Sequence, residues 1–240
     1  MKIKRVLFIV FCLLFCQLNG FTQCIDGKIN LGSGFSAEVI PPQTAALMQG
    51  KSYPKDTLIP LEDLRYVQVR HIGFDGEGRQ GELVVHKSVS CEVVDIFKEL
   101  YEAQYPIEKM RLVDYYDAND QKSMADNNSS SFCWRMITSG GLLSYHALGL
   151  AIDINPLQNP YVRGSVIEPI EGKPFVNREQ KVRGMIFEND AAVRAFKKRG
   201  WKWGGNWKKT KGYYDLQHFE KPSPLRDEYM QKMKKQSANP

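Results

Sequence analysis

The stretch Leu64–His86, LRYVQVRHIGFDGEGRQGELVVH, sets the fold class. Its two ends, LRYVQVRHIGF (64–74) and ELVVH (82–86), are rich in β-branched and aromatic residues, a composition typical of strands. The segment between them, GEGRQG (76–81), is rich in glycine, which tolerates the positive φ angles that tight turns require. We therefore predict two antiparallel strands joined by a turn.

The segment GEGRQG also matches the GxGxxG pattern of dinucleotide-binding loops. That motif requires a strand before the glycines and a helix after them. Here a second strand is predicted to follow, so the pattern indicates a hairpin turn and not a nucleotide site.

Two helices are predicted around this hairpin. Residues 90–105, SCEVVDIFKELYEAQY, carry apolar side chains at helical spacing, with Ser90 as the candidate N-cap. Residues 189–199 form the second, with Asn189 at its cap and basic residues in its last turn.

Composition divides the rest of the chain. Residues 24–63 are rich in Gly, Pro and Ser and are predicted to form an irregular lead-in, whereas the tail 225–240 is polar and basic and is expected to fray. Neither an internal repeat nor a long linker divides residues 64–224. The sequence therefore predicts a single small α+β domain with helices packed on an antiparallel sheet.

The overall composition is that of a soluble globular protein, with 240 residues, 42% hydrophobic and 25% charged. It excludes a disordered chain, a collagen-like repeat and a polytopic membrane protein. Half of the net charge of +6 comes from Lys2, Lys4 and Arg5. The remaining excess does not call for a polyanionic partner, so no nucleic-acid partner is expected.

The first residues have the layout of a secretory signal peptide, predicted over residues 1–23. Met1–Arg5 is basic, and Val6–Cys16 is an unbroken apolar run. That run is well short of the ~20 residues that span a bilayer, so no stable membrane span is expected. Export to the periplasm or the exterior follows. A lipoprotein acylated on Cys16 or Cys24 is the less favoured alternative, because neither cysteine follows the small residues that such processing prefers.

Three cysteines remain beyond the predicted signal: Cys24, Cys91 and Cys133. In an oxidising compartment two of them would pair, and Cys91 with Cys133 is the predicted pair, although the sequence does not fix the pairing.

Of four histidines, His71 and His86 lie in the predicted strands without ligand-type neighbours and are interpreted as partly buried strand residues. His146 differs, because it opens the stretch HALGLAID that ends at Asp153. Alternation along residues 151–154 places this carboxylate inside an apolar strand, where burial is costly unless a metal ion or an arginine compensates the charge.

A turn at Gly149 would let His146 and Asp153 face one point. A capped loop beside an edge strand is the equally favoured alternative. His218 follows Asp215 by three residues, so a regular strand would point them to opposite faces, and a helical turn or a bulge would bring them together. Two imidazoles and one carboxylate form the ligand set of a catalytic zinc site.

The segments SYHALGLAIDINPLQNPY (144–161) and DLQHFE (215–220) resemble the two signature motifs of the zinc D-alanyl-D-alanine carboxypeptidase and L-alanyl-D-glutamate endopeptidase family. These bacterial enzymes cut the peptide stems of peptidoglycan. The family pattern is S-x-H-x-x-G-x-A-x-D followed by E/D-x-x-H. Its fixed positions are all present: Ser144, His146, Gly149, Ala151, Asp153, Asp215 and His218.

The resemblance runs from about Leu64 to Pro222 and implies a small α+β fold of the hedgehog and DD-peptidase type. It implies one zinc ion bound by His146, Asp153 and His218, and it makes Asp215 the general base.

The resemblance also implies that Arg135 steadies the scissile carbonyl or a substrate carboxylate, and that Ser144 hydrogen-bonds the substrate or braces the site. A surface ion pair is the alternative for Arg135. The carboxypeptidase branch usually has glutamate where this chain has Asp215, which weakly favours an endopeptidase. Two rival functions stay open: a non-catalytic zinc module that binds wall peptides, and a zinc dipeptidase for other D-amino-acid peptides.

Overall fold

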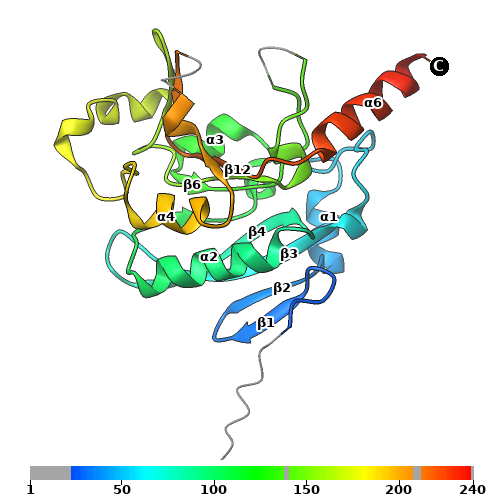
Figure 1. Ribbon diagram of the computed structural model, residues 1–240, viewed down its shortest axis with the longest axis horizontal. Helices are drawn as coiled ribbons and strands as arrows, with labels where there is room; N and C mark the ends of the chain where they lie inside the picture. Colours follow the sequence, from blue (N-terminus) through cyan, green and yellow to red (C-terminus); the bar gives the residue numbers. More distant parts are fainter. Residues whose placement is uncertain (1–22, 138–140, 208–211, 239–240) are drawn as a thin grey trace, which may run out of the picture.

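A four-stranded antiparallel sheet forms one end of the molecule. The computed structural model describes residues 23–137, 141–207 and 212–238. The sheet has the order β1-β2-β3-β4, and helix α2 (Ser90–Glu102) packs against β3 (Figure 1). The strands are β1 (Ile29–Gly32), β2 (Phe35–Val39), β3 (Leu64–Ile72) and β4 (Gly78–His86).

The predicted hairpin is present as β3 and β4. Their register runs from Leu64 opposite His86 to Ile72 opposite Gly78. The turn contains Gly76 at a φ of 90°, a value that favours glycine. Only Gly76 and Glu77 of the GxGxxG segment lie in the turn, because β4 already begins at Gly78, earlier than the predicted start at residue 82. The segment therefore belongs to a hairpin and not to a nucleotide loop.

Three smaller sheets make up the other part of the domain. Two are antiparallel, with orders β10-β12-β7 and β11-β8-β9, and the third is the parallel pair β5-β6. Their bounds are β5 (Lys109–Met110), β6 (Asn128–Ser129), β7 (Ala151–Asp153), β8 (Tyr161–Arg163), β9 (Val166–Glu168), β10 (Lys202–Trp203), β11 (Tyr214–Asp215) and β12 (His218–Glu220).

Short helices connect these sheets. The remaining α-helices are α1 (Pro42–Met48), α3 (Asp120–Ala125), α4 (Ala191–Lys197) and α6 (Leu225–Ala238). The 3-10 turns are η1 (Leu61–Asp63), η2 (Val113–Tyr116), η3 (His146–Leu148), η4 (Ile170–Phe175), η5 (Arg178–Gln180) and η6 (Gly204–Trp207).

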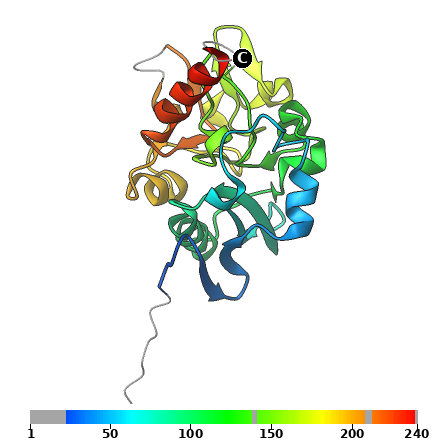
Figure 2. The ribbon, with the colours of Figure 1, turned by 90° about the vertical axis from the view of Figure 1, so that its right-hand side faces the viewer.

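One hydrophobic core joins the two parts. Phe97 of α2 meets Phe196 of α4 edge to face at 6.3 Å between ring centroids, and Phe196 stacks on Phe219 of β12 at 4.1 Å. All three side chains are fully buried. Burying one such side chain contributes about 1.5–3 kcal/mol, so these rings hold β12 through α4 against α2, the helix that covers the large sheet. Helices α2 and α4 lie side by side in both views (Figure 2).

The structure confirms the α+β class and corrects the prediction for residues 24–63. This segment contains β1, β2 and α1, and β2 pairs with β3. Phe35 and Ala37 of β2 are buried, but the flanking residues are glycines and polar residues, and these obscure the strand pattern.

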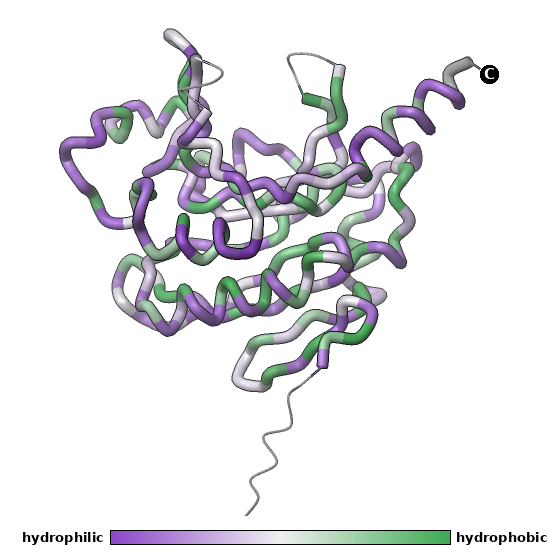
Figure 3. Tube along the Cα trace, viewed as in Figure 1, coloured by the Kyte–Doolittle hydropathy of each residue, from purple (hydrophilic) through white to green (hydrophobic). Residues whose placement is uncertain are grey.

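The prediction that residues 225–240 fray is also wrong over most of the tail, because α6 occupies Leu225–Ala238. Its lysines give it a hydrophilic appearance in Figure 3. However, Tyr229 is buried, and Leu225, Met230 and Met233 pack against the core. These four positions lie on one side of a helix, a stripe that the charged background masks.

The two predicted helices are present with shorter bounds and different caps. Helix α2 ends at Glu102, and its N-cap residue is Val89, which makes no side-chain cap hydrogen bond. The predicted cap, Ser90, is the first residue of the helix, and its hydroxyl donates to the Gly27 carbonyl at 2.6 Å. Helix α4 is capped by Asp190 and not by Asn189: the Asp190 carboxylate accepts the Val193 N–H at 2.9 Å.

The predicted Cys91–Cys133 disulfide is wrong. Cys24 pairs with Cys91 at the start of α2, and Cys133 is buried and unpaired. Gly27 lies against Ser90, which places Cys24 beside its partner, whereas the Cys133 N–H donates to the His146 carbonyl at 3.2 Å. The sequence could not show this, because Cys24 belongs to the segment that was interpreted as irregular.

None of the helices in the described parts of the chain is both long and apolar enough to cross a bilayer. Residues 1–22 lie outside the described residues, so the signal peptide stays a prediction.

Candidate metal centre

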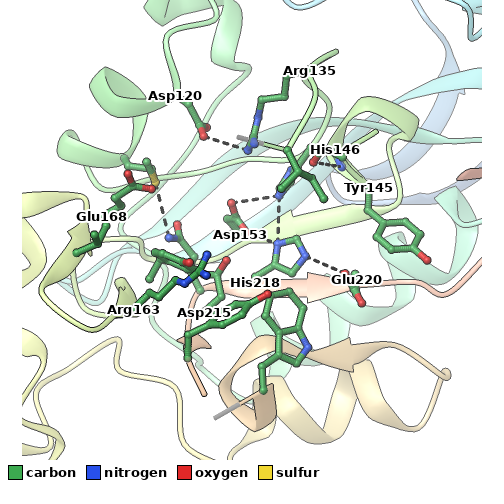
Figure 4. Close-up of a pocket in the computed structure, with 18 of the residues that line it drawn as sticks. Asp120, Arg135, Tyr145, His146, Asp153, Arg163, Glu168, Asp215, His218 and Glu220 are labelled. Atoms are coloured by element: carbon green, nitrogen blue, oxygen red, sulfur yellow. Dashed lines mark hydrogen bonds and ion pairs between the residues drawn. The ribbon is translucent and has the colours of Figure 1, made fainter. Parts of the chain in front are cut away.

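Two paired strands and one turn bring the predicted ligands together. In the pairing of β7 with β12, Asp153 lies opposite His218, and His146 begins η3 just before β7. The carboxylate oxygens of Asp153 lie 3.0 Å from His218 Nδ1 and 3.2 Å from His146 Nε2. One ligand atom from each residue lies within 4.8 Å of the others, and all three are buried (Figure 4).

Gly149 makes this arrangement possible. It ends η3 with a φ of 63°, and its carbonyl accepts the N–H of His86 at 2.9 Å. A Cβ atom at this position would lie 2.5 Å from the backbone nitrogen of His86, so the close contact with β4 requires glycine. The turn predicted between His146 and Asp153 is therefore present.

The outer nitrogens of both imidazoles have acceptors. His146 Nδ1 lies 2.7 Å from the Ser131 carbonyl oxygen, which assigns the proton to Nδ1 and leaves the Nε2 lone pair toward Asp153. His218 Nε2 lies 3.4 Å from a carboxylate oxygen of Glu220, so its Nδ1 faces the cluster. Protein metal sites hold ligating imidazoles in this way, and the donor set therefore fits a zinc ion.

The charges in the cluster also favour a cation. Burial alone would raise the pKa of the Asp153 carboxyl, but the imidazoles of His146 and His218 hold that pKa well below its usual range. Burial disfavours the charged form of His218, whereas hydrogen bonds to Asp153 and Glu220 raise its pKa to about 10. The carboxylate is thus stabilised by positive charge, which a divalent ion would supply after displacing a proton from His218.

Asp215 faces the same cavity from a different sheet. It ends β11, and His218 begins β12, so the bend at residues 216–217 replaces the regular strand that would have separated them. Its Oδ1 atom is buried and has no hydrogen-bond partner. Burial, more than any other cause, raises the pKa of Asp215 to about 7. A carboxyl group with this pKa exchanges protons near neutral pH.

Arg135 both lines the cavity and forms an ion pair. Its Nη2 atom lies 3.0 Å from Asp120, while its Nε atom is buried without a partner. The ion pair that was the alternative for Arg135 therefore exists beside its position in the site. Ser144 links the two regions, because its hydroxyl accepts the His146 N–H at 3.2 Å and its own N–H donates to the Arg135 carbonyl.

The cavity has a volume of about 400 Å³ and extends well beyond these residues. Lining residues that the sequence did not reveal include Tyr145, Arg163, Glu168, Trp207, Gln217, Glu220 and Arg226. Three of them stand within the two motifs: Tyr145 precedes His146, Gln217 precedes His218, and Glu220 lies two residues after His218 on the same face of the strand. The others come from separate elements, whose approach the sequence does not reveal.

The two remaining histidines have structural positions. His71 Nδ1 contacts the Ile107 carbonyl at 2.8 Å, and His86 Nδ1 contacts the Ser88 hydroxyl at 2.7 Å. Burial lowers the pKa of both imidazoles, so both are neutral at pH 7. This agrees with their interpretation as buried strand residues.

A family model described as D-alanyl-D-alanine carboxypeptidase matches residues 138–221. The match confirms the family resemblance. It covers the His146, Asp153 and His218 cluster together with Asp215, whereas Arg135 and α6 lie outside it. Comparisons with curated proteins and with solved structures gave no match. The family match supports a peptidase that acts on peptidoglycan-type substrates.

Proposed function

We propose that this protein hydrolyses peptide bonds in the stem peptides of bacterial peptidoglycan with one zinc ion. The observation that carries the proposal is the cluster of His146, Asp153 and His218, whose donor atoms converge at the wall of a cavity large enough for a peptide segment. The family match over the same residues supports the substrate class.

When bound, zinc would polarise the scissile carbonyl and lower the pKa of water from ~15.7 towards ~7. The carboxylate of Asp215 accepts the proton of the attacking water and passes it to the leaving amine. A pKa of about 7 suits both transfers, and Asp215, whose buried Oδ1 has no hydrogen-bond partner, lines the same cavity as the cluster. Asp215 therefore provides the acid and base functions of the reaction.

Arg135 and Ser144 complete the proposed site. The Arg135 guanidinium, held by Asp120, stabilises the oxyanion or binds a substrate carboxylate. Ser144 lines the cavity, and its hydroxyl positions the His146 backbone by accepting the His146 N–H.

The residues of the site bear on which peptide bond is cut and on the two rival functions. Aspartate in place of the glutamate usual in carboxypeptidases weakly favours an endopeptidase that cuts L-Ala-D-Glu bonds. A module that only binds wall peptides has no use for Asp215, whose buried, unpaired oxygen costs about 1–3 kcal/mol. A zinc dipeptidase would release dipeptides from substrates other than stem peptides.

We also infer that the protein is exported and acts in the periplasm or outside the cell. The Cys24–Cys91 disulfide supports this location, because disulfides persist in oxidising compartments. The same bond occupies Cys24 and leaves Cys16 as the remaining candidate for acylation.

The decisive test is a digest of purified muropeptides followed by mass spectrometry of the products. Zinc-loaded protein should create new amine termini, and the chelated protein and the Asp153→Asn variant should create none. Free D-alanine would identify a carboxypeptidase, and separated L-Ala and D-Glu ends an endopeptidase. Intact muropeptides after incubation with the zinc-loaded protein would contradict the proposal.

A further inference from the structure

Helix α6 contributes a side chain to the cavity although it lies outside the family match. The Arg226 guanidinium carbon lies 4.4 Å from the ring centroid of Tyr145, and both residues line the cavity. Tyr145 directly precedes the proposed ligand His146. Figure 4 shows Tyr145 on one side of His218, with Arg163 and Glu168 on the other.

The position of Arg226 is fixed by the packing of its helix. Tyr229 is buried, and the Met230 sulfur accepts the N–H of Leu143 at 3.2 Å. This contact joins α6 to the segment that carries Ser144 and His146. Stacking on Tyr145 orients the guanidinium plane and leaves its N–H groups free to bind a planar anion.

The charge of Arg226 has no carboxylate partner among the residues that the structure describes. Arg135 is paired with Asp120 at 3.0 Å, and Arg163 is exposed on the β8–β9 hairpin that also carries Glu168. Arg226 is half-buried, lines the cavity and forms none of the ion pairs of the described chain. A guanidinium in this situation pairs most strongly with a carboxylate, which it binds through two parallel hydrogen bonds.

We propose that Arg226 binds a carboxylate of the substrate, so that α6 makes the enzyme selective for peptides with an acidic group on the Tyr145 side of the cleaved bond. This inference rests on the proposed function. A stem peptide with lysine at its third position offers two such groups, the α-carboxylate of its D-glutamate and its C-terminal carboxylate. Both present the same planar anion to the guanidinium.

Three synthetic peptides separate these two sources: L-Ala-γ-D-Glu-L-Lys-D-Ala-D-Ala, its D-isoglutamine form and its C-terminal amide. One of the two amidated peptides lacks the carboxylate that Arg226 binds. The wild-type protein should cleave that peptide with a kcat/KM about 10-fold to 100-fold below that of the parent, which is the contribution of a charged hydrogen bond. In the Arg226→Gln variant, kcat/KM for the parent peptide should fall by the same factor, through a higher KM. This variant should cleave the parent peptide and that amidated peptide at equal rates.

Lys234→Gln is the matched control, since Lys234 is an exposed cation on the same helix and does not line the cavity. It should leave all three rates unchanged. Arg226→Lys keeps the charge and should retain part of the selectivity, which keeps the test valid if the glutamine variant folds poorly.

Loss of activity by Arg226→Gln on all three peptides to the same extent would overturn the inference, because a merely structural helix would act in that way. Equal cleavage of all three peptides by the wild-type protein would also overturn it, while leaving the proposed function intact. Cleavage of none of them by the zinc-loaded protein would instead contradict the proposed function itself.

Discussion

At the scale of single residues, the environments of the carboxyl groups determine their different roles. Asp153 faces two imidazoles and is ionised, whereas burial raises the pKa of Asp215 to about 7. This separation between a charged group and a proton-exchanging group is the pattern expected of a ligand and a general base.

Replacing the base should separate zinc binding from turnover. Asp215→Asn keeps the shape of the side chain but cannot accept a proton, so we expect unchanged zinc content and a kcat lower by about 10²–10⁴. Metal analysis and initial rates on muropeptides measure the two effects.

The Asp215→Asn variant should also differ from the wild-type protein in the pH dependence of its activity. Activity of the wild-type protein should rise with pH through an acid limb centred at or below pH 7, because the carboxyl must lose its proton and a bound cation lowers its pKa further. That limb should disappear in Asp215→Asn. Bound zinc measured at each pH is the control, and a full wild-type rate in the variant would remove Asp215 from the mechanism.

Glu220 should strengthen zinc binding through its contact with His218. Its carboxylate lies 3.4 Å from His218 Nε2, on the side away from Asp153. Glu220→Gln weakens this contact, and we expect zinc affinity to fall about 10-fold to 100-fold, the usual effect of losing an outer partner of a metal ligand. Competition with a chelator of known affinity measures the change. Equal affinities in the two proteins would rule out this role.

At the scale of elements, the sequence predicted regular segments and missed those masked by glycine or charge. The β3–β4 hairpin was predictable from its β-branched and aromatic composition, α2 from its helical spacing, and α4 from the signals at its ends. β1, β2 and α6 were not, because Gly32 and Gly34 interrupt the strand pattern and lysines surround the apolar stripe of α6. The N-cap residues Val89 and Asp190 depend on neighbouring chain segments and on which hydrogen bonds the nearby side chains form. Neither can be predicted from the sequence alone.

The turn at Gly149 should be the most sensitive element of the site. Gly149→Ala adds a methyl group at positive φ and 2.5 Å from the backbone nitrogen of His86. We therefore expect the free energy of unfolding to fall by about 1–3 kcal/mol and zinc binding to weaken. Denaturant titration and zinc analysis measure both effects. Gly50→Ala is the control, because its φ is 75° but open space surrounds it. A loss no larger than that of Gly50→Ala would contradict the role of close packing.

At the scale of the whole molecule, the site is formed where several elements meet. The sequence predicted the cluster of His146, Asp153, His218 and Asp215, because the family motifs contain those positions in a fixed order. The sequence did not predict that Arg226 lines the cavity, because this position depends on how α6 packs against the segment before η3. Local spacing identifies ligands within a motif, but only tertiary packing determines which distant side chains complete the cavity.

The disulfide should stabilise the domain without taking part in the reaction. Cys24 and Cys91 are 67 residues apart, and removing such a crosslink costs about 2–5 kcal/mol. We expect the double variant Cys24→Ser, Cys91→Ser to unfold at lower denaturant concentration while keeping its zinc and its kcat. Cys133→Ser is the control without a crosslink. An unchanged midpoint in the double variant would contradict the expected contribution of the bond.

Titration of metal-free protein with zinc, with the rate of muropeptide cleavage as the signal, tests whether one bound zinc ion is required for the reaction. We expect no cleavage at the start, a linear rise and a break at one zinc ion per chain, with no rise in His218→Ala. Full cleavage by the metal-free protein, or the same break in His218→Ala, would contradict it.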